Sequence, residues 1–462
     1  MWRTSRGDSR EVCWDTGAAG IRVCRNGRFG RVEVKRDDDL DRWLVLRVGG
    51  PHPQVHLFSR VYARSWHAEF RLCRAGRYTI HVRAMLRQPW LSWLDNWTTY
   101  ADSTPCMGPW DAGVLLQQST FQFDGHASGS LSCMGDLWSW PVDEEGSNVG
   151  STMLEQITPA PHPNRSSMHK LFGALTFTEG RRPKAVERAV AVNHRPEPLR
   201  ICVVGDSQMR TLADGMVQHI AESGRGECDC QMLAARSHAA CLKNSVGTRP
   251  CTRRLCVGTG YNVTLSYFRA SYGHELGRPW PDSSGPTLVE HLGSACTAIL
   301  VNSGQWWASW KPKPRKPHAA RAPGEYGVEI DTQMARLGAL ATRGRARVAW
   351  VATNPYPINA GGPDYVARRA RPYDMSACPP GERRFLHVIH EYNQQARRLA
   401  GVHGVDFVDT WSVALPLFDV SADGAHYAWP ASPVARPQAA RAIRWVVPVD
   451  GQHSCLGVAN AR

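Results

Sequence analysis

The sequence predicts an α/β domain preceded by a smaller β-sandwich. The chain has 462 residues, more than one hydrophobic core ordinarily serves, so two or three domains are expected. Residues 18–95 alternate apolar and polar positions between Gly, Pro and Asp turns, which is the pattern of half-buried strands. From Leu199 onward, short apolar runs alternate with longer helix-compatible runs, as in a parallel sheet covered by helices.

The first part, residues 18–95, is expected to contain short strands and no helix. The segment 68–86 is expected to form a hairpin with Arg-Ala-Gly at its turn. Five or more short strands without helices are typical of an immunoglobulin-like β-sandwich. The predicted strands are 31–35, 43–48, 55–62, 66–73 and 78–85.

The middle part, residues 96–195, has no regular pattern and is too long for a simple linker. It places Trp97, Trp110, Trp138 and Trp140 among Gly, Pro and Ser residues. We expect an irregular connecting region that packs across both neighbours or is partly disordered. The Pro- and Arg-rich stretch 181–198 marks the boundary of the third part.

The third part is predicted to be an α/β domain over residues 199–458. Its strands and helices alternate, which implies a mostly parallel sheet with helices on both faces. The predicted strands are 200–204, 264–268, 297–302, 347–353 and 405–408. The predicted helices are 208–222, 326–341, 384–400 and 438–446.

A serine, an aspartate and a histidine lie where such a sheet binds ligands. Ser207 follows the first strand in a Gly-Asp-Ser turn, and Asp423 and His426 follow the last strand in Asp-Gly-Ala-His. Carboxyl ends of parallel strands meet at one edge of the sheet. The three side chains are therefore expected to form an acyl-transfer site, with Ser207 as nucleophile, His426 as base and Asp423 orienting the imidazole. The structural alternatives are that Ser207 is a helix N-cap, that His426 is a hydrogen-bonded histidine beside a helix start, and that Asp423 is a turn former.

Four further residues are candidates for the same site. Asn302 ends a middle strand, so its amide and the Ser207 backbone N–H are expected to form the oxyanion hole, the alternative being a turn cap. Trp306 and Trp307 follow and are candidates for stacking on a sugar, or for the core. Arg210 is a candidate for holding an anionic group or pairing with a carboxylate. This chemistry needs no cofactor and no metal ion.

The charge and hydropathy of the chain exclude some classes of protein. The net charge is +14, but only seven of the 55 basic residues are lysines, and the densest basic run, 311–321, is broken by prolines. No nucleic-acid-binding motif accompanies it, so a nucleic-acid partner is not expected. Mean hydropathy is −0.38, and no window has the about 20 apolar residues of a transmembrane helix. Nothing in the sequence predicts an oligomeric state.

The cysteines favour an oxidising compartment. There are 14, including Cys228, Cys230, Cys241, Cys251 and Cys256, and their C-x-C and C-x4-C spacings fit disulfides better than a zinc site. Three glycosylation triplets, at positions 96, 164 and 262, agree with this. We expect the secretory pathway, either Golgi lumen or extracellular, with the signal or anchor missing from this sequence. A cytoplasmic protein is the alternative.

Four segments together resemble the PC-esterase branch of the GDSL/SGNH hydrolase superfamily, which includes trichome-birefringence-like O-acetyltransferases and neurexophilin and PC-esterase domain proteins. The segments are GDSQMR (205–210), YNVTLSYFRA (261–270), ILVNSGQWW (299–307) and DGAHY (423–427). The resemblance implies an SGNH-hydrolase-like, flavodoxin-like three-layer domain, with Ser207, Asp423 and His426 as the catalytic residues. Gln305 departs from the plant branch, which has a histidine at that place.

The resemblance implies an O-acyl esterase or transferase, foremost for O-acetyl groups, acting on a carbohydrate or glycan with an acyl donor. One alternative is a non-catalytic secreted or luminal binding protein that uses the β-sandwich, with the esterase fold as a scaffold. A lipid esterase is a further alternative. The sequence argues against it, because no amphipathic lid helix is evident.

Overall fold

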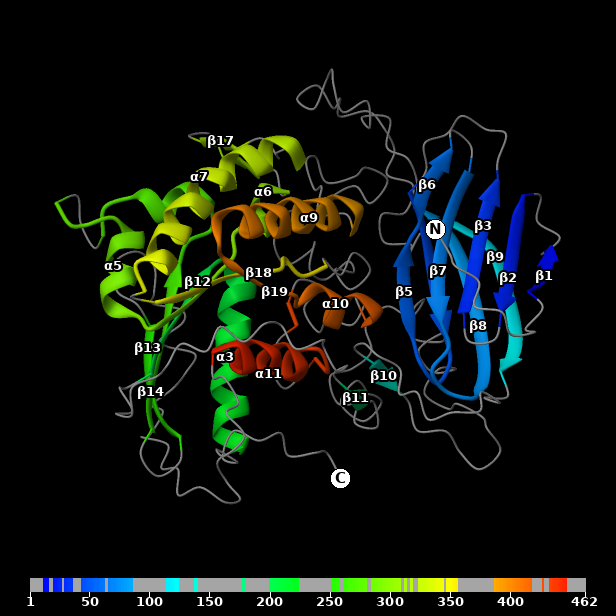
Figure 1. Ribbon diagram of the computed structural model, residues 1–462, viewed down its shortest axis with the longest axis horizontal. Helices are drawn as coiled ribbons and strands as arrows, with labels where there is room; N and C mark the ends of the chain where they lie inside the picture. Colours follow the sequence, from blue (N-terminus) through cyan, green and yellow to red (C-terminus); the bar gives the residue numbers. More distant parts are fainter. Residues whose placement is uncertain are drawn as a thin grey trace. The chain divides into compact units, whose positions relative to one another are not determined.

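The computed structural model (Figure 1) divides the chain into two compact units, one of Met1–Ser92 with Cys106–Val186 and one of Trp93–Pro105 with Glu187–Arg462. The residues that the structure describes are 11–15, 20–26, 29–35, 43–62, 65–85, 114–123, 137–139, 176–178, 199–223, 251–257, 261–280, 284–308, 311–313, 316–318, 323–344, 346–355, 386–417, 426–427 and 432–446.

The first unit contains two antiparallel sheets that enclose one apolar core. The five-stranded sheet has the order β1(Val12–Asp15), β2(Ile21–Asn26), β3(Phe29–Lys35), β7(Ser65–Arg71), β6(Ser59–Tyr62). The four-stranded sheet has the order β5(Gln54–Leu57), β4(Trp43–Gly49), β8(Gly76–Met85), β9(Val114–Phe123). Alternate residues of both sheets, such as Val32, Val34, Leu46 and Ile80, are fully buried in the same cluster, as the period of a half-buried strand requires.

The predicted hairpin at 68–86 is wrong. Its two strands belong to different sheets, because β7 pairs with β3 and β6, whereas β8 pairs with β4 and β9. Likewise, the single strand predicted at 55–62 is two strands, β5 and β6, which also belong to different sheets. A turn signal reports only that the chain reverses. Strands that reverse within one sheet and strands that cross between two packed sheets both bury alternate apolar residues. The sequence pattern therefore does not distinguish the two arrangements.

Two strands of these two sheets lie outside the predicted range 18–95. β1 precedes the range, and β9 lies within the part predicted to be irregular, where it completes the second sheet. Phe121 of β9 stacks on Tyr78 at a centroid distance of 5.9 Å. The same part of the chain carries a two-stranded sheet of β10(Leu137–Ser139) and β11(Thr176–Thr178). Strand pairing across such long connections leaves no local turn signal to predict it from.

The second unit is built on one six-stranded sheet. Its order is β13(Cys251–Val257), β14(Tyr261–Arg269), β12(Leu199–Gly205), β15(Ala298–Val301), β18(Arg347–Val351), β19(Asp406–Val408). The five strands from β14 to β19 are parallel, and β13 joins antiparallel to β14. When the five parallel strands are numbered along the chain, their spatial order across the sheet is 2-1-3-4-5, one of the two common doubly wound orders.

Helices cover both faces of this sheet (Figure 1). α3(Ser207–Ser223) and α11(Ala435–Val446) pack together on one face, where Ile201 and Val203 of β12 join Met216 and Ile443 in a single core. The other face carries α5(Leu288–Ala295), α7(Pro323–Thr342) and α9(Leu386–His403). The shorter elements are η2(Gly273–Gly277), α6(Gly304–Trp307), α10(Trp411–Ala414), η3(Leu415–Leu417) and the ribbon β16(Lys311–Lys313) and β17(Lys316–His318).

Each unit contains a disulfide bond within itself. Cys13 and Cys24 are paired across β1 and β2, and Cys202 of β12 is bonded to Cys296, which caps the end of α5. Both bonds are compatible with a secreted or luminal protein. In the part of the chain that the structure describes, none of the helices has the length and apolar character to cross a membrane.

Removing the Cys202–Cys296 disulfide is expected to destabilise the second unit by about 5 kcal/mol, because it closes a loop of 94 residues in the unfolded chain. The Cys13–Cys24 loop spans 11 residues. The same loop-closure entropy predicts that removing this disulfide destabilises the first unit by about 3 kcal/mol. The measurement is urea unfolding of C202A/C296A, C13A/C24A and the wild type, followed by circular dichroism and tryptophan fluorescence. Equal midpoints for C202A/C296A and the wild type would contradict the prediction.

Candidate active site

Ser207 is the first residue of α3, directly after a tight turn at the end of β12. Gly205 has φ +153°, and a Cβ there would lie 2.4 Å from the Asn302 carbonyl oxygen. Only glycine tolerates both the backbone conformation and the close approach. The buried Asp206 accepts a hydrogen bond from the Gln208 backbone N–H on its Oδ1, at 2.8 Å. The turn therefore presents a half-buried Ser207 hydroxyl at the carboxyl edge of the sheet.

His426 completes a serine–histidine pair. Its Nε2 lies 2.8 Å from Ser207 Oγ, although 219 positions separate the two residues in the chain. This is the distance that proton transfer between a nucleophile and its base requires. With the proton of the neutral ring on Nδ1, Nε2 accepts the hydrogen of the Ser207 hydroxyl. The pair can therefore raise the nucleophilicity of Ser207.

Asp423 lies outside the described residues. Its predicted role, to accept a hydrogen bond from His426 Nδ1–H, stays a prediction.

Asn302 lies at the carboxyl end of β15, beside the Ser207 turn, as predicted, but its amide hydrogens have other partners. Its Nδ2 donates to Val351 O at 2.7 Å and to Thr353 Oγ1 at 2.9 Å, and its Oδ1 accepts from Gly304 N at 3.1 Å. For Asn302 to donate to an oxyanion, one of these two Nδ2 bonds has to be exchanged. The observed bonds show instead that Asn302 joins β15 to the segment after β18. Its oxyanion role stays a prediction, as does that of the Ser207 N–H.

The two tryptophans of α6 differ in what they can contact. Trp307 is only 4% exposed and packs edge-on against Tyr272, with ring centroids 5.1 Å apart. It therefore belongs to the core and offers no ring face to a sugar, whereas Trp306 is half-buried. Arg210 is also half-buried and lies three residues after Ser207 on α3. Contact of Trp306 or Arg210 with a substrate stays a prediction.

Several residues at this edge had no part in the predicted site. Thr353 receives the Asn302 amide, and its backbone N–H and carbonyl are both bonded to the Asn393 side chain, at 2.7 and 2.9 Å. Tyr267 donates to the two backbone carbonyls that precede Ser207, and Tyr427, the residue after His426, donates to the Pro355 carbonyl. Both tyrosines lie inside the segments that carry the family resemblance. Asn393 is in the middle of a helix, where no local signal indicates a role.

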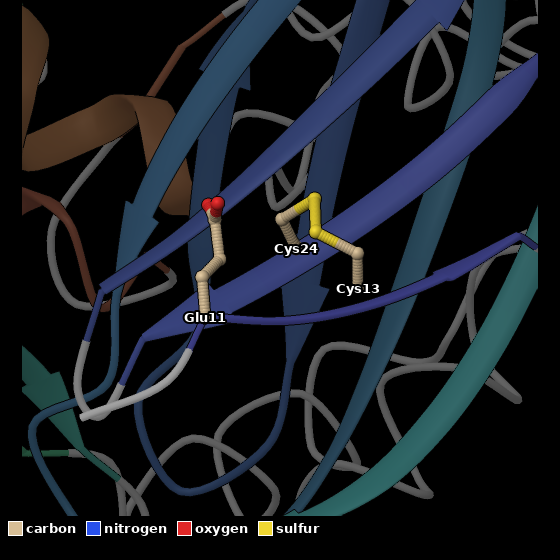
Figure 2. A group of neighbouring side chains, drawn as sticks. All are labelled: Glu11, Cys13 and Cys24. Atoms are coloured by element: carbon tan, nitrogen blue, oxygen red, sulfur yellow. A yellow bond between two sulfur atoms is a disulfide. The ribbon is translucent and has the colours of Figure 1, made fainter. Parts of the chain in front are cut away.

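The described residues contain one group of side chains close enough together to hold a metal ion, and it lies in the first unit. Figure 2 shows Glu11 beside Cys13 and Cys24. The two sulfur atoms are joined in a disulfide, so neither offers a thiolate. The Glu11 carboxylate instead forms an ion pair with Arg31 at 3.5 Å. This group does not fit a metal site.

Comparison with known proteins shows distant structural similarities. No family model matches the chain, and no curated protein matches it. Among solved structures it is similar to a GDSL-like lipase from Parabacteroides merdae, with 11% identity, a TM-score of 0.29, and 54% of this chain and 96% of the lipase covered. It is also similar to the ferric enterobactin esterase of Salmonella typhimurium, with 12% identity, a TM-score of 0.17, and coverage of 84% and 91%. Both TM-scores are low, so the function of this chain has to be argued from the geometry of its own site.

Proposed function

We propose that this protein is a serine-dependent O-acyl esterase or acyltransferase that acts on a carbohydrate, with acetyl as the foremost acyl group. The observation that carries the proposal is the 2.8 Å contact between Ser207 Oγ and His426 Nε2 at the carboxyl edge of a parallel sheet. Two residues so far apart in sequence meet there because β12 lies in the middle of the sheet and α11, which follows His426, packs against α3.

The first half of the reaction forms an acyl-enzyme. Ser207 Oγ attacks the acyl carbonyl carbon while His426 Nε2 takes the hydroxyl proton, and the carbonyl oxygen becomes an oxyanion. The Ser207 N–H belongs to the first turn of α3, where backbone N–H groups have no partner within the helix, so it is suited to stabilise this charge. As the C–O bond of the ester breaks, the protonated His426 returns its proton to the leaving oxygen.

The second half releases the acyl group. Water or a sugar hydroxyl attacks the acyl-Ser207 carbonyl, and His426 accepts the proton of the attacking group and then returns it to Ser207 Oγ. Water gives hydrolysis, and a sugar hydroxyl gives transfer. Asp423, three residues before His426, is proposed to hold the imidazole in the tautomer that leaves Nε2 free.

We further propose that the second unit belongs to the PC-esterase branch of the SGNH hydrolases and that the first is immunoglobulin-like. The 2-1-3-4-5 strand order supports a flavodoxin-like three-layer domain. In the first unit, the orders β2-β3-β7-β6 and β5-β4-β8-β9 match the ABED and C′CFG sheets of an immunoglobulin-like sandwich when β2 is taken as strand A. β1 is then an additional edge strand.

Labelling with a fluorophosphonate probe tests the proposed function. The full-length protein is expected to become covalently labelled, and S207A is expected to lose all labelling while its circular dichroism spectrum stays unchanged. S271A is the matched control, since Ser271 follows the neighbouring strand β14 at the same edge, and it should label like the wild type. A wild type that does not label, or an S207A variant that labels equally, would overturn the proposal. The first outcome would favour the non-catalytic binding protein.

A further inference from the structure

Two buried tyrosines, one on the serine side and one on the histidine side of the serine–histidine pair, donate hydrogen bonds to backbone carbonyls. On the serine side, the hydroxyl of Tyr267 lies 3.0 Å from both Gly205 O and Asp206 O, the two carbonyls that precede Ser207. Tyr267 is 3% exposed. Burial, and secondarily the Asp206 charge, raise the pKa of Tyr267 well above its usual value of 10. The hydroxyl therefore stays protonated and remains a donor at any working pH.

On the histidine side, Tyr427 is the residue directly after His426. Its ring is 2% exposed, and its hydroxyl donates to Pro355 O at 3.1 Å. Pro355 ends the described segment 352–355, here called the edge segment, which follows β18 at the carboxyl edge of the sheet. The bond therefore fixes the chain beside His426 to the same sheet that carries Ser207.

The edge segment is itself held from several sides. Asn393 of α9 bonds both the N–H and the carbonyl of Thr353, and Asn302 of β15 donates to Thr353 Oγ1. Asn354 Oδ1 accepts from Gln438 of α11 at 2.7 Å. These side chains are all buried, and buried hydrogen bonds of this kind resist displacement. Pro355 O is therefore a firm anchor for the Tyr427 hydroxyl.

We infer that Tyr427 and Tyr267 are positioning residues, which together set the distance between His426 Nε2 and Ser207 Oγ. The inference rests on the proposed function. Neither hydroxyl touches the reacting atoms. Each acts through the backbone of its neighbour, Tyr427 on His426 and Tyr267 on the turn that presents Ser207. Misplacement of a catalytic group by about 1 Å can cost about 100-fold in rate, so two backbone anchors of this kind have a large effect.

The test compares three Tyr→Phe variants of the full-length chain. Y427F and Y267F each remove one hydroxyl and keep the ring. Y78F is the matched control, because Tyr78 is fully buried in the first unit and its hydroxyl also donates to a backbone carbonyl, Arg74 O, at 2.9 Å. The measurements are kcat and KM for p-nitrophenyl acetate and the rate constant of fluorophosphonate labelling, each normalised to the number of folded molecules.

Y427F and Y267F are each expected to lower kcat and the labelling rate about 10- to 100-fold with KM little changed, whereas Y78F keeps wild-type values. A wild-type kcat in both site variants would overturn the inference, and so would an equal loss in Y78F. S207A, measured alongside, separates the two proposals. If S207A labels like the wild type, the proposed function fails; if it does not label and Y427F and Y267F are unaffected, only the positioning role fails.

Discussion

Replacing His426 by alanine is expected to slow fluorophosphonate labelling of Ser207, and ester hydrolysis, by about 1,000-fold or more. Without the imidazole, the Ser207 hydroxyl has to lose its proton to water, since Nε2 is its hydrogen-bond partner at 2.8 Å. The measurement is the second-order labelling rate constant of H426A at neutral pH, with hydrolysis of p-nitrophenyl acetate as a second readout. An imidazole that merely packs beside a helix start would leave both rates unchanged.

The double variant S207A/H426A sharpens this prediction. Residues that act as one unit in catalysis lose nearly all of their effect when either is removed. S207A, H426A and the double variant are therefore expected to share nearly the same residual hydrolysis rate. H390A on α9 is the control, since His390 packs against Trp411 at a centroid distance of 5.8 Å and has no part in the proposed reaction. Independent losses that multiply in the double variant would argue against a serine–histidine pair.

Replacing Gly205 by alanine is expected to destabilise the second unit by about 2 kcal/mol or more and to abolish labelling of Ser207. The residue has φ +153°, and an added Cβ would lie 2.4 Å from Asn302 O and 2.5 Å from Met209 Cγ. Relief of the overlap with Asn302 O requires β12 or β15 to move, because a backbone carbonyl cannot rotate away as a flexible side chain does. Either movement displaces Ser207 from His426.

Gly344 is the matched control for Gly205. It follows α7 with φ +67°, and a Cβ there would meet nothing within 4 Å. G344A therefore carries only the left-handed backbone cost of about 1 kcal/mol and should label at the wild-type rate. Thermal unfolding and the labelling rate of both variants are the measurements. A G205A variant as stable and as reactive as G344A would show that the turn is not closely packed.

The elements of the second unit could largely be predicted from the sequence. The predicted strand 200–204 corresponds to β12, and the predicted helix 208–222 corresponds to α3. Strand and helix periods are local properties of a sequence, so each apolar run reports its own type of element. The antiparallel edge strand β13 was not predicted, since it is not needed for the alternation of strands and helices along the chain. The helix α5 was not predicted either, although it lies between the parallel strands β14 and β15, because its eight residues are too few to show a clear helical period.

Contacts between distant elements could not be predicted in the same way. Which strands pair in the first unit was misjudged at the 68–86 hairpin, because inward-facing residues such as Phe70 and Tyr78 enter one shared core from two different sheets. Similarly, nothing in the sequence around Asn302 indicates that its two amide hydrogens are bonded to Val351 O and Thr353 Oγ1. Competition among buried donors and acceptors is settled only when neighbouring strands are in place.

By itself, the sequence determined the alternation of strands and helices in the second unit, because strand and helix periods are local properties. It also predicted that Ser207 and Asn302 lie at one edge of the sheet, because parallel strands present their carboxyl ends together. Only the tertiary structure decided that His426 reaches Ser207, that Trp307 is core rather than surface, and that Tyr267 and Tyr427 anchor the backbone on either side of the pair. The physical reason is that hydrogen bonding and burial at the edge depend on residues hundreds of positions apart, which packing alone brings within contact.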